Sequence, residues 1–556
     1  MTAVLRAAEP SAGYLVEVEP TLTRGFELLV TAPSGIARLR ELICSFAVRG
    51  KLMPQDPLDQ PAAGLLAPLR RERARLTEAG RVRKDRDADE AIQHDLDLPR
   101  GWAAARLADV AWPQAGFAFK SSAFNDACHG LPLIRIRDVG ANSPTMYFSG
   151  EFREEFIVRP GDWLIGMDGD FRVAQWSGPD ALLNQRVTRL VFFGDEIKKV
   201  YVTLALQIEL RKLQGTKAYT TVDHLSGSQI ASRIIALPPL AEQHRIVARV
   251  EELMKLCDAL EQSGRLADEQ HARLTSTLFD ALAASESAHA LAENWQRVAE
   301  HFDLLLDRPD AIDALEQTVL RLAVRGLLVS QELTDGLALE LVAEIADEKR
   351  RLVNEGQIRP DKEMPGLLRD EQAFQIPNSW AWIRFGHASI NRDGERIPVA
   401  STDRENLAKI YDYYGASGVI DKIDRFLFDK TLLLIGEDGA NLINRSTPIA
   451  FLAHGKFWVN NHAHVIDVSH EGLLDYLCLY VNATPLEPYV TGTAQPKMNQ
   501  SKLNSIPVAL PPLAEQKRIV ARVEELRCLC ADLRQRLTQA RETQSSLADS
   551  LVTEIA

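Results

Sequence analysis

The chain has 556 residues and a formal net charge of −13, and 46% of its residues are hydrophobic and 25% charged. This composition is typical of soluble globular proteins with several domains, and it excludes disordered and membrane-embedded classes. The N-terminal residues lack the basic start and apolar core of a signal peptide, and no run reaches the roughly 18 apolar residues of a membrane span. We therefore expect a cytoplasmic protein, whose six scattered cysteines are reduced thiols.

The chain contains two nearly identical segments. Leu-Pro-Pro-Leu-Ala-Glu-Gln occurs at 237–243 and again at 510–516, an interval of 273 residues. Ala-Val-Arg-Gly at 47–50 recurs at 323–326, an interval of 276. A period of this length belongs to whole domains rather than to solenoid repeats. The sequence therefore predicts a tandem duplication with pseudo-twofold symmetry, suited to a partner that presents its features twice.

The excess negative charge lies outside two variable blocks, 98–236 (the first insert) and 378–509 (the second insert). Residues 100–236 carry 16 basic and 14 acidic side chains, and residues 378–509 carry 12 and 14. An acidic surface repels a phosphate backbone, so any contact with nucleic acid belongs to the nearly neutral inserts.

Taken in chain order, residues 1–35 have no clear period and form an arm of unknown order. Helices are predicted over 36–49 and 62–79 because each ends at a glycine that can adopt the left-handed cap conformation. Together with the charged linker 81–97 they make an N-terminal helical region, 36–97. The first insert then has short apolar runs separated by Gly, Asp and Asn, which predict strands at 133–137, 162–165 and 185–193.

Residues 237–377 are predicted to be a central helical region. Apolar side chains at Ile246, Val250, Leu253, Cys257 and Leu260 alternate steps of four and three, which is a heptad pattern. The region also contains the second copy's helices, 311–325 and 337–354. The second insert has the same strand-and-turn texture as the first, with Trp380 corresponding to Trp102. The C-terminal segment 510–556 repeats the heptad helix.

Each heptad helix would span about 40 residues, or roughly 60 Å. Such a helix cannot bury its apolar stripe alone, so we expect the two copies to pack against each other. The predicted fold class is α/β (α+β): two α/β domains separated by long helices packed as an antiparallel coiled coil, in an internal repeat.

Few residues suggest catalysis. The sequence has no phosphate-binding loop, methyltransferase signature, nucleophile elbow or paired Cys-x2-Cys. His462 and His464 would point to one face of a strand, as a metal pair could, but they are more readily explained as polar surface groups. The Asp-Gly turns at 168–170 and 436–439 could hold Mg²⁺ in a nuclease, yet turn formation is the commoner role of such aspartates.

Polar side chains suited to DNA are more numerous. Arg pairs with guanine and Asn or Gln with adenine, whereas Lys and Ser mostly contact phosphates. We expect Arg135 and Arg137 to alternate with apolar neighbours on one strand. The complete set of candidate DNA-binding residues is Arg135, Arg137, Arg172, Gln175, Asn184, Gln185 and Arg186 in the first insert, and Tyr413, Tyr414, Ser417, Asn441, Asn444, Arg445, Lys497 and Asn499 in the second.

The doubled Leu-Pro-Pro-Leu-Ala-Glu-Gln segment, each time followed by a heptad helix, resembles the specificity subunit of type I restriction-modification systems. Tyr-Gly-Ala-Ser-Gly-Val-Ile at 414–420, Leu-Ile-Gly-Glu-Asp-Gly-Ala at 434–440 and Val-Asn-Asn-His at 459–462 carry the resemblance into the second insert. It extends from about residue 36 to the C-terminus. It is weaker in the first insert, where Leu133–Asp138 and Asp162–Gly166 are the main similarities.

The resemblance implies a non-catalytic subunit with two target recognition domains, each of which reads half of a bipartite site in double-stranded DNA. In the family, the helices recruit two methyltransferase subunits and, through them, restriction/translocase subunits. S-adenosylmethionine, ATP and Mg²⁺ are then used by those partners, and this chain itself holds no cofactor or metal. Two alternatives remain from the residues alone: a scaffold whose two domains bind proteins, and a metal-dependent nuclease that uses the Asp-Gly turns.

Overall fold

The computed structural model describes residues 20–82, 97–213, 225–360, 365–470, 472–492 and 495–555. Its contacts divide the chain into two compact units: unit 1 is Met1–Arg265 with Arg541–Ala556, and unit 2 is Leu266–Ala540. Two long helices, α7 (Leu240–Ala283) and α17 (Leu513–Ile555), each contribute residues to both units. The first insert belongs to unit 1 and the second insert to unit 2.

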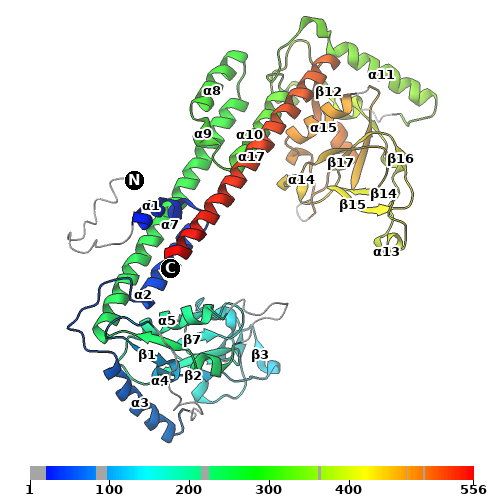
Figure 1. Cartoon of the computed structure of the whole chain (residues 1–556). Coiled ribbons are helices and arrows are strands. Elements are labelled where there is room, and N and C mark those ends of the chain that lie inside the picture. The colour runs from blue at the N-terminus through cyan, green and yellow to red at the C-terminus, as the bar shows by residue number, and fades with distance from the viewer. Residues whose placement is uncertain are drawn as a thin grey trace. The chain divides into compact units, whose positions relative to one another are not determined.

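Unit 1 combines helices with three small sheets, whose strands are drawn from blue through cyan to green in Figure 1. Its other helices are α1 (Pro20–Thr31), α2 (Gly35–Val48), α3 (Ala63–Glu78), α4 (Leu107–Val110), α5 (Lys199–Arg211) and α6 (Gly227–Ala231). A two-stranded sheet pairs β1 (Ala103–Arg106) with β11 (Ile234–Leu237) and so joins the two ends of the first insert.

The first insert holds two larger sheets. One has the order β2-β10-β7-β8, from β2 (Ala111–Ala115), β10 (Val187–Phe192), β7 (Trp163–Gly166) and β8 (Val173–Gln175). The other has the order β3-β5-β4-β9-β6, from β3 (Phe124–Asn125), β5 (Tyr147–Phe148), β4 (Leu131–Ile134), β9 (Ala181–Leu183) and β6 (Ile157–Val158). All pairings are antiparallel except that of β4 with β9.

Unit 2 repeats this topology with one exception. Its pair is β12 (Ala381–Arg384) with β21 (Pro507–Leu510), and its four-stranded sheet is β13 (Ile390–Asn391), β20 (Ala463–Asp467), β17 (Leu432–Gly436) and β18 (Ala450–Ala453). The third sheet is β15 (Gly418–Ile423), β14 (Tyr411–Gly415), β19 (Lys456–Val459) and β16 (Phe428–Asp429), again with one parallel pair, β14 with β19. Among the described residues, β3 is the strand without a counterpart. The two inserts therefore share one fold despite their different sequences.

Unit 2 also contains several shorter helices, which are labelled in Figure 1 where there is room. They are α8 (Ala288–Glu300), α9 (Phe302–Leu305), α10 (Pro309–Val324), α11 (Ala338–Asn354), α12 (Phe385–Ala388), α13 (Ser401–Arg404), α14 (Asn441–Asn444), α15 (Leu473–Ala483) and α16 (Gln500–Ser505).

The repeated Leu-Pro-Pro-Leu-Ala-Glu-Gln segment fastens the start of each long helix to the adjacent insert. Glu242 is buried in the first turns of α7 and accepts a hydrogen bond from the indole Nε1 of Trp102 at 3.0 Å. The side-chain amide of Gln243 donates to the carbonyl of Pro238 at the strand exit, where Pro239 supplies no N–H. The second copy has the same two bonds, Trp380 to Glu515 at 2.9 Å and Gln516 to Pro511 at 2.8 Å.

An ion pair also connects each long helix to a segment that precedes the insert. Arg245 of α7 reaches Asp59 at 2.6 Å, and Arg518 of α17 reaches Asp335 at 2.6 Å. Asp59 lies between α2 and α3, and Asp335 lies between α10 and α11. Each ion pair therefore connects two such lead-in helices to a long helix. Hydrogen bonding to Arg518 lowers the pKa of Asp335 below its ordinary value.

Within unit 2 the two long helices run antiparallel, as their heptad patterns predicted, and α10 packs on both. Along α10, Arg308 and Arg321 pair with Asp268 and Asp280 of α7, so these two helices are parallel. The pairs of Asp313 with Arg534 and of Glu316 with Arg527 show that α17 runs the other way. One hydrophobic cluster contains Phe279 and Leu282 of α7, Leu315 of α10 and Cys530 of α17.

In unit 1 the long helices are covered by the N-terminal helices. Cys257 of α7 packs against Leu39 and Ile43 of α2, and Ala548 of α17 packs against Leu29 of α1. Thus apolar side chains of the long helices in unit 1 are buried against α1 and α2.

Most predicted elements are confirmed. The helices expected at 36–49, 62–79, 311–325 and 337–354 are α2, α3, α10 and α11, and the fold class of two mixed α/β domains with long helices is as predicted. Part of the expected arm is helical, since α1 begins at Pro20, whereas 1–19 and the linker residues 83–96 lie outside the described residues. The cysteines are free thiols, although Cys128 and Cys528 are exposed rather than in the core.

One strand prediction is wrong. β4 ends at Ile134, and a 3-10 helix follows over Ile136–Asp138, because the Asp138 carboxylate accepts a hydrogen bond from the backbone N–H of Arg135 and closes a turn. Arg135 and Arg137 therefore do not alternate on a strand. Within the described part of the chain, every helix is too short or too polar to cross a bilayer.

Candidate nucleic-acid interface

In the first insert, several predicted DNA-binding residues meet where β7 ends and β10 begins. Arg186 lies in the turn before β10, and its guanidinium contacts the carboxylate of Asp168, just beyond β7, at 3.2 Å. The backbone supports the same contact, because the N–H of Met167 donates to the carbonyl of Arg186 at 3.1 Å. Gln185, the preceding residue, is exposed. Two turns far apart in sequence thus present polar side chains at one end of the sheet.

Arg172 and Arg137 flank this end. Arg172 is exposed at the start of β8, and its guanidinium lies over Gly140, where a Cβ would be only 2.7 Å from it. The 3-10 helix that carries the exposed Arg137 packs through Ile136 next to Gly166, the last residue of β7. The predicted residues that share this end of the sheet are Arg137, Arg172, Gln185 and Arg186.

Three other predicted residues of the first insert are placed differently. Gln175 lies at the far end of β8, opposite Trp163, where its amide donates to the carbonyl of Gly161. Arg135 is half-buried and donates to the hydroxyl of Thr145. Asn184 is half-buried in the turn before β10.

In the second insert, the equivalent end of the sheet carries a denser set of charges. His462, in the turn before β20, lies with its Nδ1 2.8 Å from the carboxylate of Asp438, just beyond β17. The neighbouring Glu437 pairs with Arg396 at 2.8 Å and with Lys497 at 3.2 Å. Burial would raise the pKa of Glu437, but these cations lower it below its ordinary value. Lys497 is therefore held beside the turn, with half of its side chain exposed.

The hairpin between β14 and β15 adds a third turn to this end. A Cβ at Gly436 would lie 2.8 Å from the carbonyl of Ala416, so only glycine allows the hairpin to approach β17 so closely. The N–H of Asn460 donates to the carbonyl of Tyr414. The exposed groups gathered here are Ser417, His462 and Lys497.

Several residues predicted to contact DNA have structural roles instead. Tyr413 is 1% exposed, and its hydroxyl is bonded to the backbone of Val399, so it is a core residue. The ring of Tyr414 is half-buried and stacks on Phe451. Successive side chains of a strand point to opposite faces of the sheet, so Tyr413 and Tyr414 cannot both face solvent, and Tyr413 lies on the buried face.

Three polar side chains close local turns. Asn441 accepts hydrogen bonds from the N–H of Thr447 and the hydroxyl of Ser446. Asn499 caps α16 by accepting from the N–H of Lys502. Arg445 donates to carbonyls at the C-terminal end of α15, and burial lowers its pKa. Asn444, at the end of α14, is exposed.

The two histidines considered as a metal pair have separate partners. His464 is 1% exposed, with Nδ1 2.6 Å from Asp393 and Nε2 2.8 Å from the carbonyl of Met498. Burial opposes the charge of Asp393, but His464 and Arg396 outweigh it and lower the pKa of Asp393. His462 lies before β20 rather than in it. Within the described ranges, no three His, Cys, Asp or Glu side chains are grouped as a metal would require.

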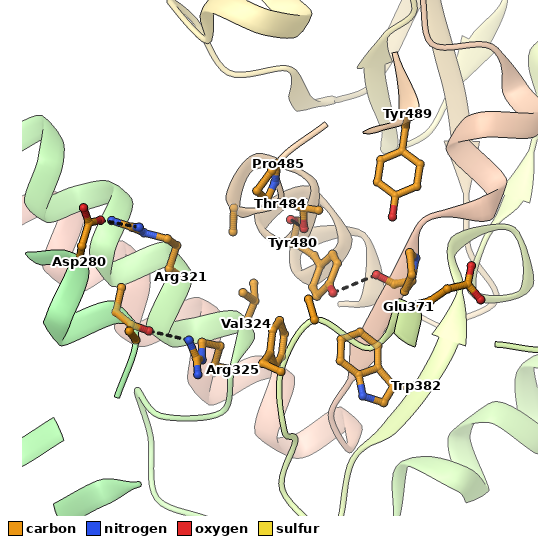
Figure 2. A pocket seen from close by; sticks show the side chains of 16 residues that line it. Asp280, Arg321, Val324, Arg325, Glu371, Trp382, Tyr480, Thr484, Pro485 and Tyr489 are labelled. Atoms are coloured by element: carbon orange, nitrogen blue, oxygen red, sulfur yellow. Dashed lines mark hydrogen bonds and ion pairs between the residues drawn. The ribbon is translucent and has the colours of Figure 1, made fainter. Parts of the chain in front are cut away.

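A cavity of about 340 Å³ lies elsewhere in unit 2, beside the C-terminal turns of α7, α10 and α15. Figure 2 shows Val324, Trp382, Tyr480 and Tyr489 around it, with Arg321 directed toward Asp280. Its charged groups already have partners: Arg321 pairs with Asp280, and Glu371 pairs with Arg384 at 2.7 Å. None of the predicted DNA-binding residues lines this cavity, so it is separate from the candidate interface.

Sequence reasoning missed two residues of the candidate interface, His462 and Arg396. The sequence suggested His462 as a metal ligand or a polar surface group, not as a DNA contact, and did not single out Arg396. The available signal was that His462 directly precedes an apolar run and follows Asn460 and Asn461, as Arg186 follows Asn184 and Gln185. Arg396 gives no such signal, because its partners are distant in sequence.

Comparison with known proteins agrees with this duplicated arrangement. The family model described as type I restriction modification DNA specificity domain matches twice, at residues 99–268 and 388–540. The EcoEI specificity subunit of a type I restriction enzyme from Escherichia coli is 31% identical over 560 residues, and the match covers 93% of each chain. The EcoAI specificity subunit, also from Escherichia coli, is 30% identical over 567 residues, with the same coverage.

A solved structure, the HsdS subunit from Thermoanaerobacter tengcongensis, is matched over 84% of this chain and 99% of that chain, with 16% identity and a TM-score of 0.36. The family assignment follows from the two domain matches and the two full-length relatives. This chain belongs to the DNA specificity subunits of type I restriction-modification systems.

Proposed function

We propose that each insert reads one half of a bipartite site in double-stranded DNA, and that the chain has no catalytic activity of its own. The observation that carries this proposal is the shared strand order of the two inserts, combined with different side chains at equivalent ends of their sheets. The same scaffold with different polar groups is what two readers of different sequences require. Because its target is DNA inside a cell, the chain would act in the cytoplasm.

The long helices would connect the two readers and fix the number of base pairs between the half-sites. α7 and α17 contain 44 and 43 residues, or about 65 Å of helix at 1.5 Å per residue. The first insert packs on the first turns of α7, and the second insert packs on the first turns of α17. A helix is stiff over this length, so the gap between half-sites would be set within narrow limits.

The same helices would bind two methyltransferase subunits and, through them, restriction/translocase subunits. Leu256 and Leu274 of α7 are 54% and 46% exposed, and Leu529 and Leu547 of α17, 273 residues later, are 60% and 54% exposed. Exposed leucines are costly unless a partner covers them, and their recurrence at equivalent positions suits two copies of one partner.

Chemistry would belong to those partners, with S-adenosylmethionine, ATP and Mg²⁺ as their cofactors. The arrangement of the Asp-Gly turns supports a non-catalytic chain: Asp168 and Asp438 pair with Arg186 and His462 instead of grouping with other carboxylates. A cation-paired carboxylate has less charge available for Mg²⁺.

Exchange of one insert tests the proposal. Residues 378–509 would be replaced by the equivalent insert of the EcoEI relative, and the complex purified with its co-purifying subunits would select from randomised duplex DNA. We expect two separated half-sites, of which only one changes on exchange. Changes in both halves would refute the modular assignment. Selection of no sequence at all would favour a protein-binding scaffold, and Mg²⁺-dependent cleavage by the chain alone would favour a nuclease.

A further inference from the structure

Arg186 and His462 occupy the same position in the two inserts. β10 and β20 are the equivalent strands of the two four-stranded sheets, and each begins directly after one of these residues. The registers agree, since the first residues of these strands pair with the last residues of their neighbours: Val187 with Gly166, and Ala463 with Gly436. The equivalence therefore rests on hydrogen-bonded register and not on sequence similarity.

The backbone around the two residues is also the same. The residue after each glycine donates its N–H to the carbonyl of Arg186 or His462, Met167 to Arg186 at 3.1 Å and Glu437 to His462 at 2.9 Å. Arg186 and His462 each end a turn that begins with asparagine, Asn-Gln-Arg at 184–186 and Asn-Asn-His at 460–462. Two diverged inserts have thus kept one geometry at this point and changed the side chain it presents.

Arg186 and His462 each contact an aspartate that lies two residues beyond the glycine. Arg186 contacts Asp168 at 3.2 Å, and His462 contacts Asp438 at 2.8 Å. The exposed fractions of the side chains nearly coincide: 52% and 18% for Arg186 and Asp168, and 50% and 16% for His462 and Asp438. In both inserts a mostly buried carboxylate therefore orients a half-exposed donor at the end of the sheet.

We propose that Arg186 and His462 are base-reading side chains of their respective inserts, with Asp168 and Asp438 as positioning residues. This inference rests on the proposed half-site function and names the position in each reader that carries specificity. A nearby carboxylate weakens attraction to a phosphate, because its negative charge repels the phosphate, but it fixes the donor for hydrogen bonding to a base edge. Arginine in this position matches the O6 and N7 acceptors of guanine.

Reciprocal substitutions test the assignment in the full complex. Arg186→His and His462→Arg would each be purified with the co-purifying subunits, and the DNA they select from randomised duplexes would be sequenced. We expect Arg186→His to reduce the preference for guanine at one position of one half-site about 10- to 100-fold. His462→Arg should raise the guanine preference at one position of the other half-site by a similar factor.

Matched controls make the same changes at the opposite ends of the same sheets. Arg159 is exposed before the start of β7, and the exposed His454 contacts Thr431 before the start of β17. Arg159→His and His454→Arg should leave both half-sites unchanged. Asp168→Asn should broaden the base preference at the position read by Arg186 without creating a preference for another base. Asp168→Glu keeps the carboxylate and should retain the wild-type preference.

The outcomes separate this inference from the proposed function. If the wild-type complex selects no bipartite sequence, the proposed function fails. If the wild-type complex selects a bipartite sequence, and Arg186→His and His462→Arg select the same sequence with the same base preferences, the base-reading assignment is overturned. A uniform loss of binding with unchanged base preferences would also overturn it, because that result indicates a contact with phosphate.

Discussion

At the scale of single residues, the repeated Glu-Gln pair explains why the Leu-Pro-Pro-Leu-Ala-Glu-Gln segment occurs twice. Glu242 and Glu515 are buried and accept from Trp102 and Trp380, which begin the two inserts. An unpaired buried indole N–H costs about 1–3 kcal/mol, so a carboxylate at this position stabilises the junction between insert and helix. The segment therefore connects an insert to the start of a long helix, and it occurs twice because the chain has two such connections.

Glu515 predicts a pH dependence of stability. Burial raises its pKa, although Trp380 and Gln331 donate hydrogen bonds to it. A carboxyl whose pKa is higher in the folded state stabilises the fold most below the ordinary value of about 4.3, and that contribution is lost as pH rises through the folded-state pKa. Glu515→Gln cannot ionise, so wild-type stability should fall relative to the variant as the pH rises from about 4.5 through the raised folded-state pKa of Glu515.

The measurement is the free energy of unfolding by guanidinium across this pH range. Glu525→Gln serves as the control, because Glu525 is an exposed carboxylate on the same helix. Parallel curves for wild type and Glu515→Gln would show that burial does not disturb the ionisation of Glu515.

At the scale of elements, short helices and turns of the inserts are closed by polar side chains that sequence alone suggests for DNA. Arg445 donates to the carbonyls of Val481, Asn482 and Thr484, which α15 leaves without partners at its C-terminal end. This role needs a residue near in space and distant in sequence. The same chemistry that reads guanine thus serves here as a helix cap.

We predict that Arg445→Ala destabilises unit 2 by about 1–3 kcal/mol, because buried carbonyls lose their donor. The selected DNA sequence should stay unchanged, since this side chain is engaged by α15. Thermal unfolding gives the first result and selection from randomised DNA the second. Asn444→Ala, an exposed neighbour, is the matched control for stability. A changed half-site without loss of stability would restore Arg445 to the candidate readers.

At the scale of the whole molecule, the duplication gives each insert its own hydrophobic core and its own connection to a long helix. The two larger cores, one in each unit, contain the insert sheets, the lead-in helices and the first turns of α7 or α17. Each insert is therefore a packed domain and not a loop on a helical frame, which is why we expect exchange of an insert to be tolerated.

Lengthening α7 should change the spacing of the DNA site. Four residues inserted after Leu260 add about one turn, roughly 6 Å, and rotate the C-terminal part of the helix by about 40°. We expect the complex to prefer a longer gap between half-sites or to lose binding, as read from selected sequences. The same insertion at Gly455, an exposed turn in the second insert where a Cβ would meet no atom, should leave the gap unchanged. An unaltered gap in the helix variant would argue against a spacer.

The sequence by itself determined the duplication, the helix bounds and the position of the inserts. These features depend on local or periodic signals: glycines after α2 and α3, steps of four and three along α7, and identical segments 273 residues apart. They also carried the family assignment. Two of the three strands predicted in the first insert, 162–165 and 185–193, correspond to β7 and β10, since apolar runs between turn residues are local patterns.

Only the tertiary structure decided which polar residues lie together at the candidate interface. Tyr413 and Ser417 lie four residues apart, yet one is in the core and the other at an exposed hairpin tip. Arg186 and Arg445 look alike in sequence, but one faces solvent beside Asp168 and the other caps α15. The physical reason is that a side chain's role depends on partners brought near by strand register and helix packing, and those partners lie tens of residues away along the chain.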